Sequence, residues 1–202
     1  MIEVRIHGRG GQGNVVAAYL LAAAVIRGGY HAQAFPAFGA ERRGAPVVAF
    51  VRCRERPILR RSAVERPNFA IVQDPALLRL DATLAGLRDD GALLLNAGRE
   101  ATWNGTPAAA RWVGLPATAI AEETIGRPIP NTPLLAAFLT LTGLVPLDAL
   151  TAVIDERFDA AKAAANRRAV AEAAARVDEG AWADLIPEKQ ADRVRETAGR
   201  GR

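Results

Sequence analysis

Apolar and polar residues follow two different periods near the start of the chain. Residues 2–6 alternate between apolar and polar side chains, which is typical of a β-strand. A breaker-free apolar run over residues 14–27 predicts a helix, and because its apolar residues surround the axis, we expect it to be buried. Further short apolar runs predict strands over residues 31–35, 46–53, 69–72, 92–95 and 113–115. Helical patterns cover residues 77–87, 118–126, 132–142 and 147–177.

Turn signals separate these elements. Asp74-Pro75 predicts a helix start, because a capping carboxylate is followed by a proline in the first turn. Asn104-Gly105 predicts a hairpin turn. Strands and helices alternate along most of the chain, and only helices follow. The sequence therefore predicts an α/β fold with a mostly parallel, doubly wound (Rossmann-like) sheet and a helical C-terminal third.

The composition is that of a folded globular protein. Half of the 202 residues are apolar and 24% are charged, which excludes collagen-like, low-complexity and largely disordered chains. The single cysteine, Cys53, excludes an intramolecular disulfide and a cysteine-ligated zinc or iron–sulfur site built from this chain alone. The sequence shows neither the layout of a signal peptide nor an apolar stretch long enough to span a membrane, so we expect a cytoplasmic protein.

The net charge of +4 is concentrated in one segment. Residues 42–66 hold eight arginines against two glutamates, which gives this segment a charge of +6 and leaves −2 on the rest of the chain. Guanidinium groups suit bidentate contacts with phosphates and carboxylates. A nucleic acid partner is disfavoured, because aromatic and basic residues do not interleave along a sheet face and no helix-turn-helix spacing is present.

A glycine-rich loop follows the first predicted strand and opens the first helix. Residues 8–13 fit the pattern G-x-G-x-x-G, which allows close backbone approach and offers the N–H groups of a helix N-terminus to an anion. A glycine turn needed only for helix–sheet packing is the other interpretation. A dinucleotide site is disfavoured, because residues 33–36 at the end of the second strand contain no acid to hold the ribose hydroxyls.

A second cluster, residues 35–46, combines two phenylalanines, glycine and proline breakers, and the triplet Glu41-Arg42-Arg43. In a doubly wound sheet, the loop after the second strand lies at the same carboxyl edge as the glycine loop. We therefore expect both loops to face one crevice. Arg42 and Arg43 could bind an anion while Glu41 orients one of them, or the triplet could form a salt-bridge network at an interface; the sequence leaves both open.

Together these motifs resemble a known family. Residues 5–13 closely resemble the start of the gamma subunit of 2-oxoacid:acceptor oxidoreductases, the family of pyruvate:ferredoxin oxidoreductase. Residues 34–47 are similar to the family's second signature, and residues 129–132, which precede a helix, are similar to its third. The resemblance covers about residues 1–180, and residues 181–202 are expected to be a C-terminal extension that contacts other subunits or is frayed.

The resemblance implies one subunit of a complex that oxidatively decarboxylates a 2-oxoacid to an acyl-CoA. Thiamine diphosphate, magnesium and iron–sulfur clusters would lie on partner subunits of the alpha, beta and delta types, and electrons would pass to ferredoxin or another acceptor. The chain itself has no Gly-Asp-Gly…Asn thiamine diphosphate motif and no cysteine set for a cluster. An aryl 2-oxoacid enzyme, of the indolepyruvate or phenylglyoxylate type, would have the same chemistry. A stand-alone nucleotide-binding module is the alternative from another class.

In this family the gamma part is associated with coenzyme A access and with covering the thiamine site. The residues expected to bind coenzyme A are Gly8, Arg9, Gly10, Gly11, Gln12, Gly13, Glu41, Arg42, Arg43, Asn131 and Thr132. The backbone N–H groups of residues 10–13, with Arg9, would hold a phosphate, and a second helix start at Asn131 would add donors. No residue is assigned to proton transfer or nucleophilic attack, and Cys53 is expected to be structural.

Overall fold

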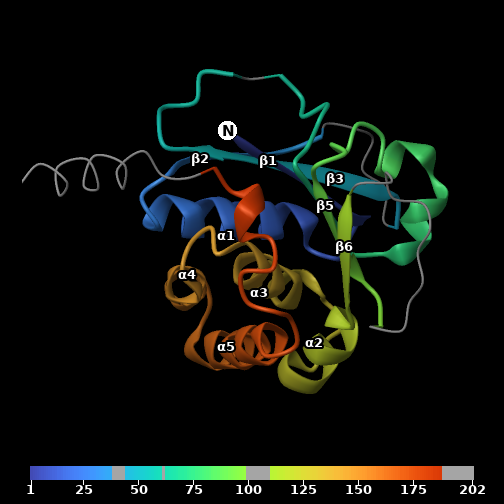
Figure 1. Ribbon diagram of the computed structural model, residues 1–202. Coiled ribbons are helices and arrows are strands. Elements are labelled where there is room, and N and C mark those ends of the chain that lie inside the picture. Colours follow the sequence, from blue (N-terminus) through green and yellow to red (C-terminus); the bar gives the residue numbers. More distant parts are fainter. Residues whose placement is uncertain (38–43, 61, 99–109, 188–202) are drawn as a thin grey trace, which may run out of the picture.

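A single mixed sheet organises the chain. The computed structural model describes residues 1–37, 44–60, 62–98 and 110–187, and their six strands form a sheet with the order β2–β3–β1–β4–β5–β6 (Figure 1). The strands are β1 (Ile2–Arg9), β2 (His31–Pro36), β3 (Pro46–Arg54), β4 (Phe69–Val72), β5 (Ala92–Asn96) and β6 (Arg111–Leu115). β1, β4, β5 and β6 pair in parallel, and β3 pairs antiparallel to β1 and to β2. The predicted mostly parallel α/β sheet is therefore confirmed.

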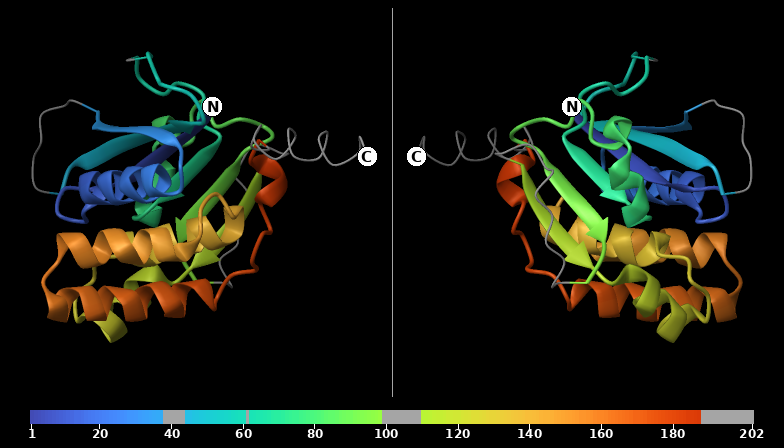
Figure 2. Two further views of the ribbon diagram at one scale, coloured as in Figure 1. Left: turned by 90° about the vertical axis from the view of Figure 1, so that its left-hand side faces the viewer. Right: turned by 90° about the vertical axis from the view of Figure 1, so that its right-hand side faces the viewer.

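The α-helices of the described chain lie on one face of this sheet in two layers (Figures 1 and 2). They are α1 (Asn14–Arg27), α2 (Ala117–Ile125), α3 (Asn131–Thr142), α4 (Leu147–Arg157) and α5 (Ala160–Ala174). α1 and α3 contact the strands, and α2, α4 and α5 pack on these two helices. Every residue of α3 except Thr140 is buried, so α3 lies at the centre of the core. The predicted helical C-terminal third is confirmed.

The opposite face of the sheet carries two buried arginines. Arg52 of β3 is fully buried; its Nε donates to Glu3 Oε1 at 2.7 Å, and its guanidinium lies over the Phe35 ring at 5.3 Å. Arg5 of β1 donates to the carbonyl oxygens of Ala85, Val64 and Glu65 at 2.8, 3.0 and 3.1 Å. These bonds help to fix residues 55–60 and 62–66, here called the strap, across this face of the sheet.

The helix predicted over residues 77–87 is wrong. Two short 3₁₀ turns, η1 (Pro75–Arg79) and η2 (Asp81–Thr83), stand in its place, separated by Leu80 in an extended conformation. The predicted cap is present, since Asp74 Oδ1 accepts from the Ala76 N–H at 2.9 Å. The helix does not continue because the Ala85 carbonyl accepts from Arg5 and because Gly86, at φ +74°, packs directly against the Glu65 carbonyl. Contacts with β1 and the strap thus override a local helical pattern.

The helical pattern predicted over residues 147–177 corresponds to two helices, because the chain breaks at Phe158 and Asp159. Both residues are extended, and α4 and α5 lie on either side of them. The Asp159 carboxylate caps α5 by accepting from the Lys162 N–H at 2.9 Å. The break turns α5 back against α3 and α2, where a straight helix could not reach. The hairpin turn predicted at Asn104-Gly105 lies outside the described residues.

The described chain ends with a segment that packs on the core. The Trp182 side chain is buried and stacks on Phe69 with ring centroids 6.1 Å apart, and its backbone N–H donates to the Leu141 carbonyl at 2.7 Å. Arg111 of β6 binds Asp184 through both of its terminal nitrogens. Within the described chain, no helix combines the length and the apolar character needed to cross a membrane.

Candidate functional site

The glycine loop lies at the carboxyl edge of the sheet, between β1 and α1. After β1, the chain first adds β2 and β3 on one side of β1 in the sheet. It then adds β4, β5 and β6 on the other side of β1. In open α/β sheets such a switch in strand order marks the crevice where ligands bind. Gly11 (φ +99°) and Gly13 (φ +78°) have backbone conformations that L side chains rarely adopt. The sequence pattern therefore corresponds to a real backbone requirement at this crevice.

Two hydrogen bonds of Gln12 fix the shape of the loop. The Gln12 N–H donates to the Arg9 carbonyl at 3.0 Å, and the Gln12 Oε1 accepts from the Arg9 N–H at 2.7 Å. The Gln12 side chain thus acts as an internal clamp of the loop, a role that the glycine pattern did not reveal. A clamped loop presents the N-terminus of α1 in one orientation.

The N-terminus of α1 carries the features of an anion site. Gly13 is its N-cap, and among the described residues no side chain caps this end. A Cβ placed on Gly11 would meet no described atom within 4 Å, so the backbone there is open on one side. Unpaired N–H groups and the helix dipole give such an end a partial positive charge. A phosphate could approach the backbone over Gly11.

Arg9, which the sequence assigns to the ligand, is bound to a carboxylate. Its Nε donates to Asp74 Oδ2, and its Nη1 donates to the Gly44 carbonyl at 3.1 Å. The side chain keeps 37% of its exposure, so the guanidinium remains accessible beside the loop. Asp74, which also caps η1, is a residue of the site that the sequence reasoning used only as a helix cap. Its position directly after β4, the parallel neighbour of β1, was the available signal.

The loop after β2 approaches the glycine loop, as expected. The Gly10 N–H donates to the Ala45 carbonyl at 3.0 Å, and the Asn14 Nδ2 donates to the Val47 carbonyl at 2.7 Å. The described end of this second loop therefore lies against the first. The predicted site residues Glu41, Arg42 and Arg43 lie outside the described residues.

The start of α3 adjoins the glycine loop, but Thr132 is occupied elsewhere. A Cβ on Gly13 would lie 2.7 Å from the Asn131 Nδ2, so the Asn131 amide packs directly on the N-cap of α1. The Thr132 hydroxyl is buried and bonds to Asn166 Oδ1 of α5 at 2.8 Å. Asn131 therefore joins the predicted cluster in space, whereas the Thr132 side chain links two helices of the core.

Buried amides without partners lie along the same edge. Gln73 follows β4 and is 1% exposed, and neither its Oε1 nor its Nε2 has a hydrogen-bond partner in the described part of the chain. Asn14 Oδ1 is also buried and has no hydrogen-bond partner in the described part of the chain. The Gln73 carbonyl accepts from Asn96 Nδ2 at 2.7 Å, which connects the ends of β4 and β5. Buried polar atoms in native proteins are normally satisfied, often by ordered water, so these amide atoms mark polar sites beside the glycine loop that the described residues do not satisfy.

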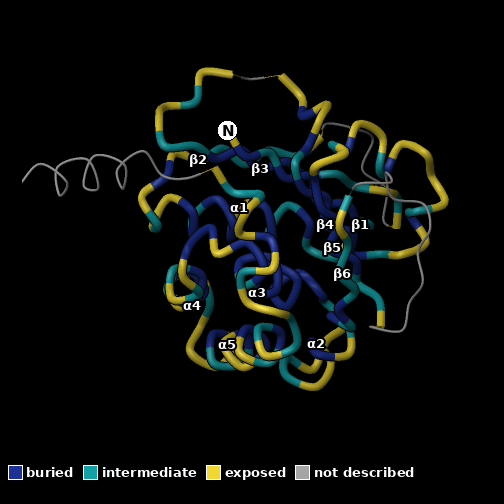
Figure 3. Tube along the Cα trace, viewed as in Figure 1, coloured by how far each residue is buried: buried dark blue, intermediate teal, exposed yellow. Residues whose placement is uncertain are grey.

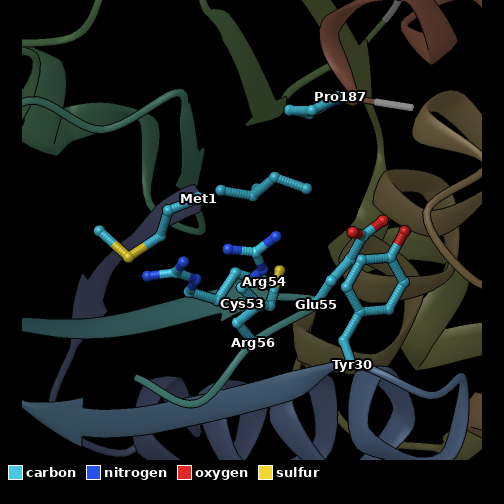
Figure 4. Close-up of a pocket in the computed structure, with 8 residues that line it drawn as sticks. Met1, Tyr30, Cys53, Arg54, Glu55, Arg56 and Pro187 are labelled. Atoms are coloured by element: carbon cyan, nitrogen blue, oxygen red, sulfur yellow. The ribbon is translucent and has the colours of Figure 1, made fainter. Parts of the chain in front are cut away.

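Two buried titratable groups lie outside this crevice. Burial, together with the nearby Arg5 charge, lowers the pKa of His7 to about 3. Burial raises the pKa of the Cys53 thiol to about 12, so the thiolate that would be reactive is suppressed. Cys53 lines a cavity of about 260 Å³ with Met1, Tyr30 and Pro187 (Figure 4). This cavity lies at the start of β1, the opposite end from the glycine loop.

Comparisons with known proteins agree on one family. A family model described as pyruvate ferredoxin/flavodoxin oxidoreductase matches residues 3–176. The chain is 48% identical over 159 residues to pyruvate synthase subunit PorC of Methanothermobacter marburgensis, covering 78% of this chain and 87% of that protein. It is 42% identical over 176 residues to the pyruvate/ketoisovalerate oxidoreductases common subunit gamma of Thermococcus kodakarensis, covering 86% and 95%. The crystal structure of pyruvate oxidoreductase subunit PORC from Thermotoga maritima superposes with a TM-score of 0.73 at 38% identity, covering 86% and 95%.

Proposed function

Because the chain belongs to the pyruvate ferredoxin/flavodoxin oxidoreductase family, as its gamma-type subunit, we propose that it binds coenzyme A at the glycine loop. The complete enzyme would convert a 2-oxoacid and coenzyme A into an acyl-CoA and carbon dioxide. The two electrons released would pass to ferredoxin or another acceptor. This chain would deliver the coenzyme A thiol to the place where the acyl group is formed and would help to close that place to water.

The hard chemical steps belong to partner subunits of the alpha, beta and delta types. Thiamine diphosphate with magnesium would supply the decarboxylation chemistry there, and iron–sulfur clusters would carry the electrons. With one cysteine, this chain cannot hold a cysteine-ligated cluster by itself. Its own residues are proposed to bind and orient a substrate, and no proton transfer is assigned to them.

One observation carries the proposal: α1 begins, uncapped among the described residues, at a clamped glycine loop on the switch point of the sheet. The N–H groups of Gly10 and Gln12 donate to protein carbonyls, so those of Gly11, Gly13 and the first turn of α1 would meet a phosphate or pyrophosphate group, which coenzyme A provides. Arg9 lies beside them and is oriented by Asp74. Asn131 borders the loop, while Glu41, Arg42 and Arg43 are proposed to order the crevice from the loop after β2. Thr132 is proposed to act through Asn131, since its hydroxyl is bound to Asn166 and its N–H donates to Asn131 Oδ1 at 2.8 Å.

An aryl 2-oxoacid, of the indolepyruvate or phenylglyoxylate type, is the alternative substrate. The chemistry is the same, and the substrate pocket would lie mainly on partner subunits. A stand-alone nucleotide-binding module is the alternative from another class. It would use the same loop, and it would be monomeric and active in binding without thiamine- or cluster-bearing chains.

The test is a pair of substitutions at Gly11 in the assembled enzyme. Gly11→Asp places a carboxylate in the open space over the loop, and Gly11→Asn places a neutral side chain of the same shape there, so both carry the same backbone strain. We expect the aspartate variant to raise the half-saturating coenzyme A concentration by about tenfold or more relative to the asparagine variant. Subunit composition should be the same in both. An equal half-saturation in the two variants would remove the loop from the site.

A further inference from the structure

The exposed side of α1 is apolar. Tyr19 is 47% exposed and Ile26 is 54% exposed, and they lie seven residues apart on one side of the helix. The half-buried Val15 and Ala23 lie on the same side, and Arg27 is the helix's one charged residue. A surface helix normally turns charged residues to water. The composition of α1 is therefore that of a helix covered on both sides.

A groove continues this apolar side toward the edge of the sheet. It has a volume of about 430 Å³ and is lined by Ile26, Tyr30, His31, Ala32, Gln33, Pro57 and Ile58. Ile26 belongs both to the exposed side of α1 and to the groove. The groove also runs along β2, which is an edge strand of the described sheet and pairs there with β3 alone. Apolar helix, groove and strand edge thus form one continuous surface.

The strap supplies the outer wall of the groove and its most exposed apolar residue. Leu59 is 91% exposed, and Figure 3 shows the strap exposed along most of its length. Side chains of β2 and β3 nevertheless fix the strap from below: Gln33 Nε2 donates to the Ile58 carbonyl at 2.9 Å, and Arg52 Nη2 donates to the Ala63 carbonyl at 2.9 Å. Because the backbone on either side of Leu59 is fixed by these bonds, its entry into a pocket on a partner costs less backbone conformational entropy than that of a free loop.

The charged residues around this surface are mostly arginines. Residues 54–66 hold five arginines against two glutamates, and Arg56 and Arg60 are exposed on the strap. A complementary partner surface carries carboxylates around an apolar pocket. Two copies of this chain that met strap to strap would bring like charges together, which disfavours a symmetric dimer through this surface.

We infer that α1, the groove and the strap form the surface by which this chain docks on a partner subunit of the oxidoreductase, with Leu59 entering an apolar pocket that acidic residues surround. This inference rests on the proposed function, because it takes the partner to be another protein chain of the same enzyme. Large exposed apolar patches with a charged rim are the usual mark of such an interface.

Cysteine labelling of the assembled enzyme tests the inference. Cys53 is the chain's one cysteine and is 1% exposed, so a cysteine introduced at the surface is the reactive thiol of this chain. Leu59→Cys is compared with Leu80→Cys, which replaces another exposed leucine, 47% exposed, between η1 and η2. Maleimide addition is followed by the mass of this chain alone. We expect the complex to label Leu59→Cys about tenfold or more slowly than the isolated chain does, and Leu80→Cys at a rate within about twofold.

The outcomes separate this inference from the proposed function. Equal labelling of Leu59→Cys in the isolated chain and in a complex that assembles and turns over would overturn the docking surface and leave the function intact. Protection that depends on the concentration of the isolated chain would identify a second copy as the occupant and would also overturn it. A wild-type chain that never assembles with thiamine- and cluster-bearing chains would overturn the proposed function itself.

A charge substitution tests the acidic rim independently. Arg60→Glu should lower the yield of co-purified partner subunits severalfold at low salt, and the deficit relative to wild type should shrink as salt screens the repulsion. Arg79→Glu, at an exposed arginine of η1, is the matched control and should leave the yield unchanged. The same yield for both variants at low salt would contradict an acidic partner surface.

Discussion

The Arg9 guanidinium donates from its Nε to the Asp74 carboxylate and so joins the glycine loop to the end of β4. Arg9 ends β1, and Asp74 follows the strand that pairs with β1 in parallel. The two side chains therefore meet over the switch point of the sheet. Asp74 orients the cation beside the proposed phosphate site, and it also places a negative charge close to that site.

Substitutions of the two partners should act in opposite directions on coenzyme A. Arg9→Gln removes the cation and should raise the half-saturating concentration by about tenfold or more, since charge-assisted contacts contribute about 1.5–3 kcal/mol. Asp74→Asn keeps an oxygen to cap Ala76 and removes the charge, so it should lower that concentration at low salt. Steady-state kinetics of the assembled enzyme at two salt concentrations measure both effects. Shifts of the same sign in the two variants would contradict a phosphate at this loop.

Local patterns predicted the strands and the glycine loop, because they depend on neighbouring residues only. The run over residues 69–72 became β4 with the predicted bounds, and the apolar run over 14–27 became α1. The motifs also identified the gamma-type family correctly. By contrast, the Arg9–Asp74 pair depends on β4 pairing with β1, which no local pattern encodes. The helix expected over residues 77–87 failed for the same reason, since Arg5 binds the Ala85 carbonyl and Gly86 packs against the Glu65 carbonyl of the strap.

The contact between Gly13 and Asn131 predicts a stability effect larger than backbone strain alone. Gly13→Ala adds a Cβ at φ +78° and 2.7 Å from the Asn131 Nδ2, whereas Gly29→Ala adds one at φ +87° where no described atom lies within 4 Å. Gly29→Ala should therefore cost about 1 kcal/mol and Gly13→Ala about 2–3 kcal/mol in the free energy of unfolding. Urea titration measures both.

A double substitution checks the cause of that difference. Asn131→Ala in the Gly13→Ala background removes the side chain that the new methyl group meets, so it should cost less there than in the wild-type chain. If the losses in the free energy of unfolding from Gly13→Ala and Asn131→Ala were purely additive, Asn131 would not pack on the loop. A smaller cost of Asn131→Ala in the Gly13→Ala background would show that the start of α3 fixes the position of the proposed phosphate site.

Burial of His7 predicts a pH dependence of stability. Its pKa is lowered from 6.5 to about 3 in the folded chain, chiefly by burial and further by the Arg5 charge. Between these pH values the unfolded chain binds a proton at His7 that the folded chain does not. Lowering the pH therefore stabilises the unfolded chain relative to the folded chain. The stabilising contribution is complete above about pH 6.5 and decreases by about 1.4 kcal/mol per pH unit below it.

The comparison of two neutral variants isolates this effect. His7→Gln should flatten the fall in unfolding free energy between about pH 6 and pH 4. His31→Gln, at the chain's other, exposed histidine, should leave the fall unchanged. Urea midpoints measured across this range provide the slopes. A slope that is the same in His7→Gln and in wild type would assign the acid sensitivity to other groups.

Trp182 predicts that the folded unit extends beyond residue 176, where the family match ends. Its indole is 2% exposed and stacks on Phe69 of β4 at 6.1 Å. Trp182→Ala should therefore lower the free energy of unfolding by about 3–5 kcal/mol, and Trp182→Phe should lower it less because it keeps a ring on Phe69. Asp184→Ala, which removes the exposed partner of Arg111 in the same segment, should have little effect. If Trp182→Ala unfolded at the wild-type urea concentration, the segment after α5 would be an appendage; the packing on Phe69 instead requires it to melt together with the sheet.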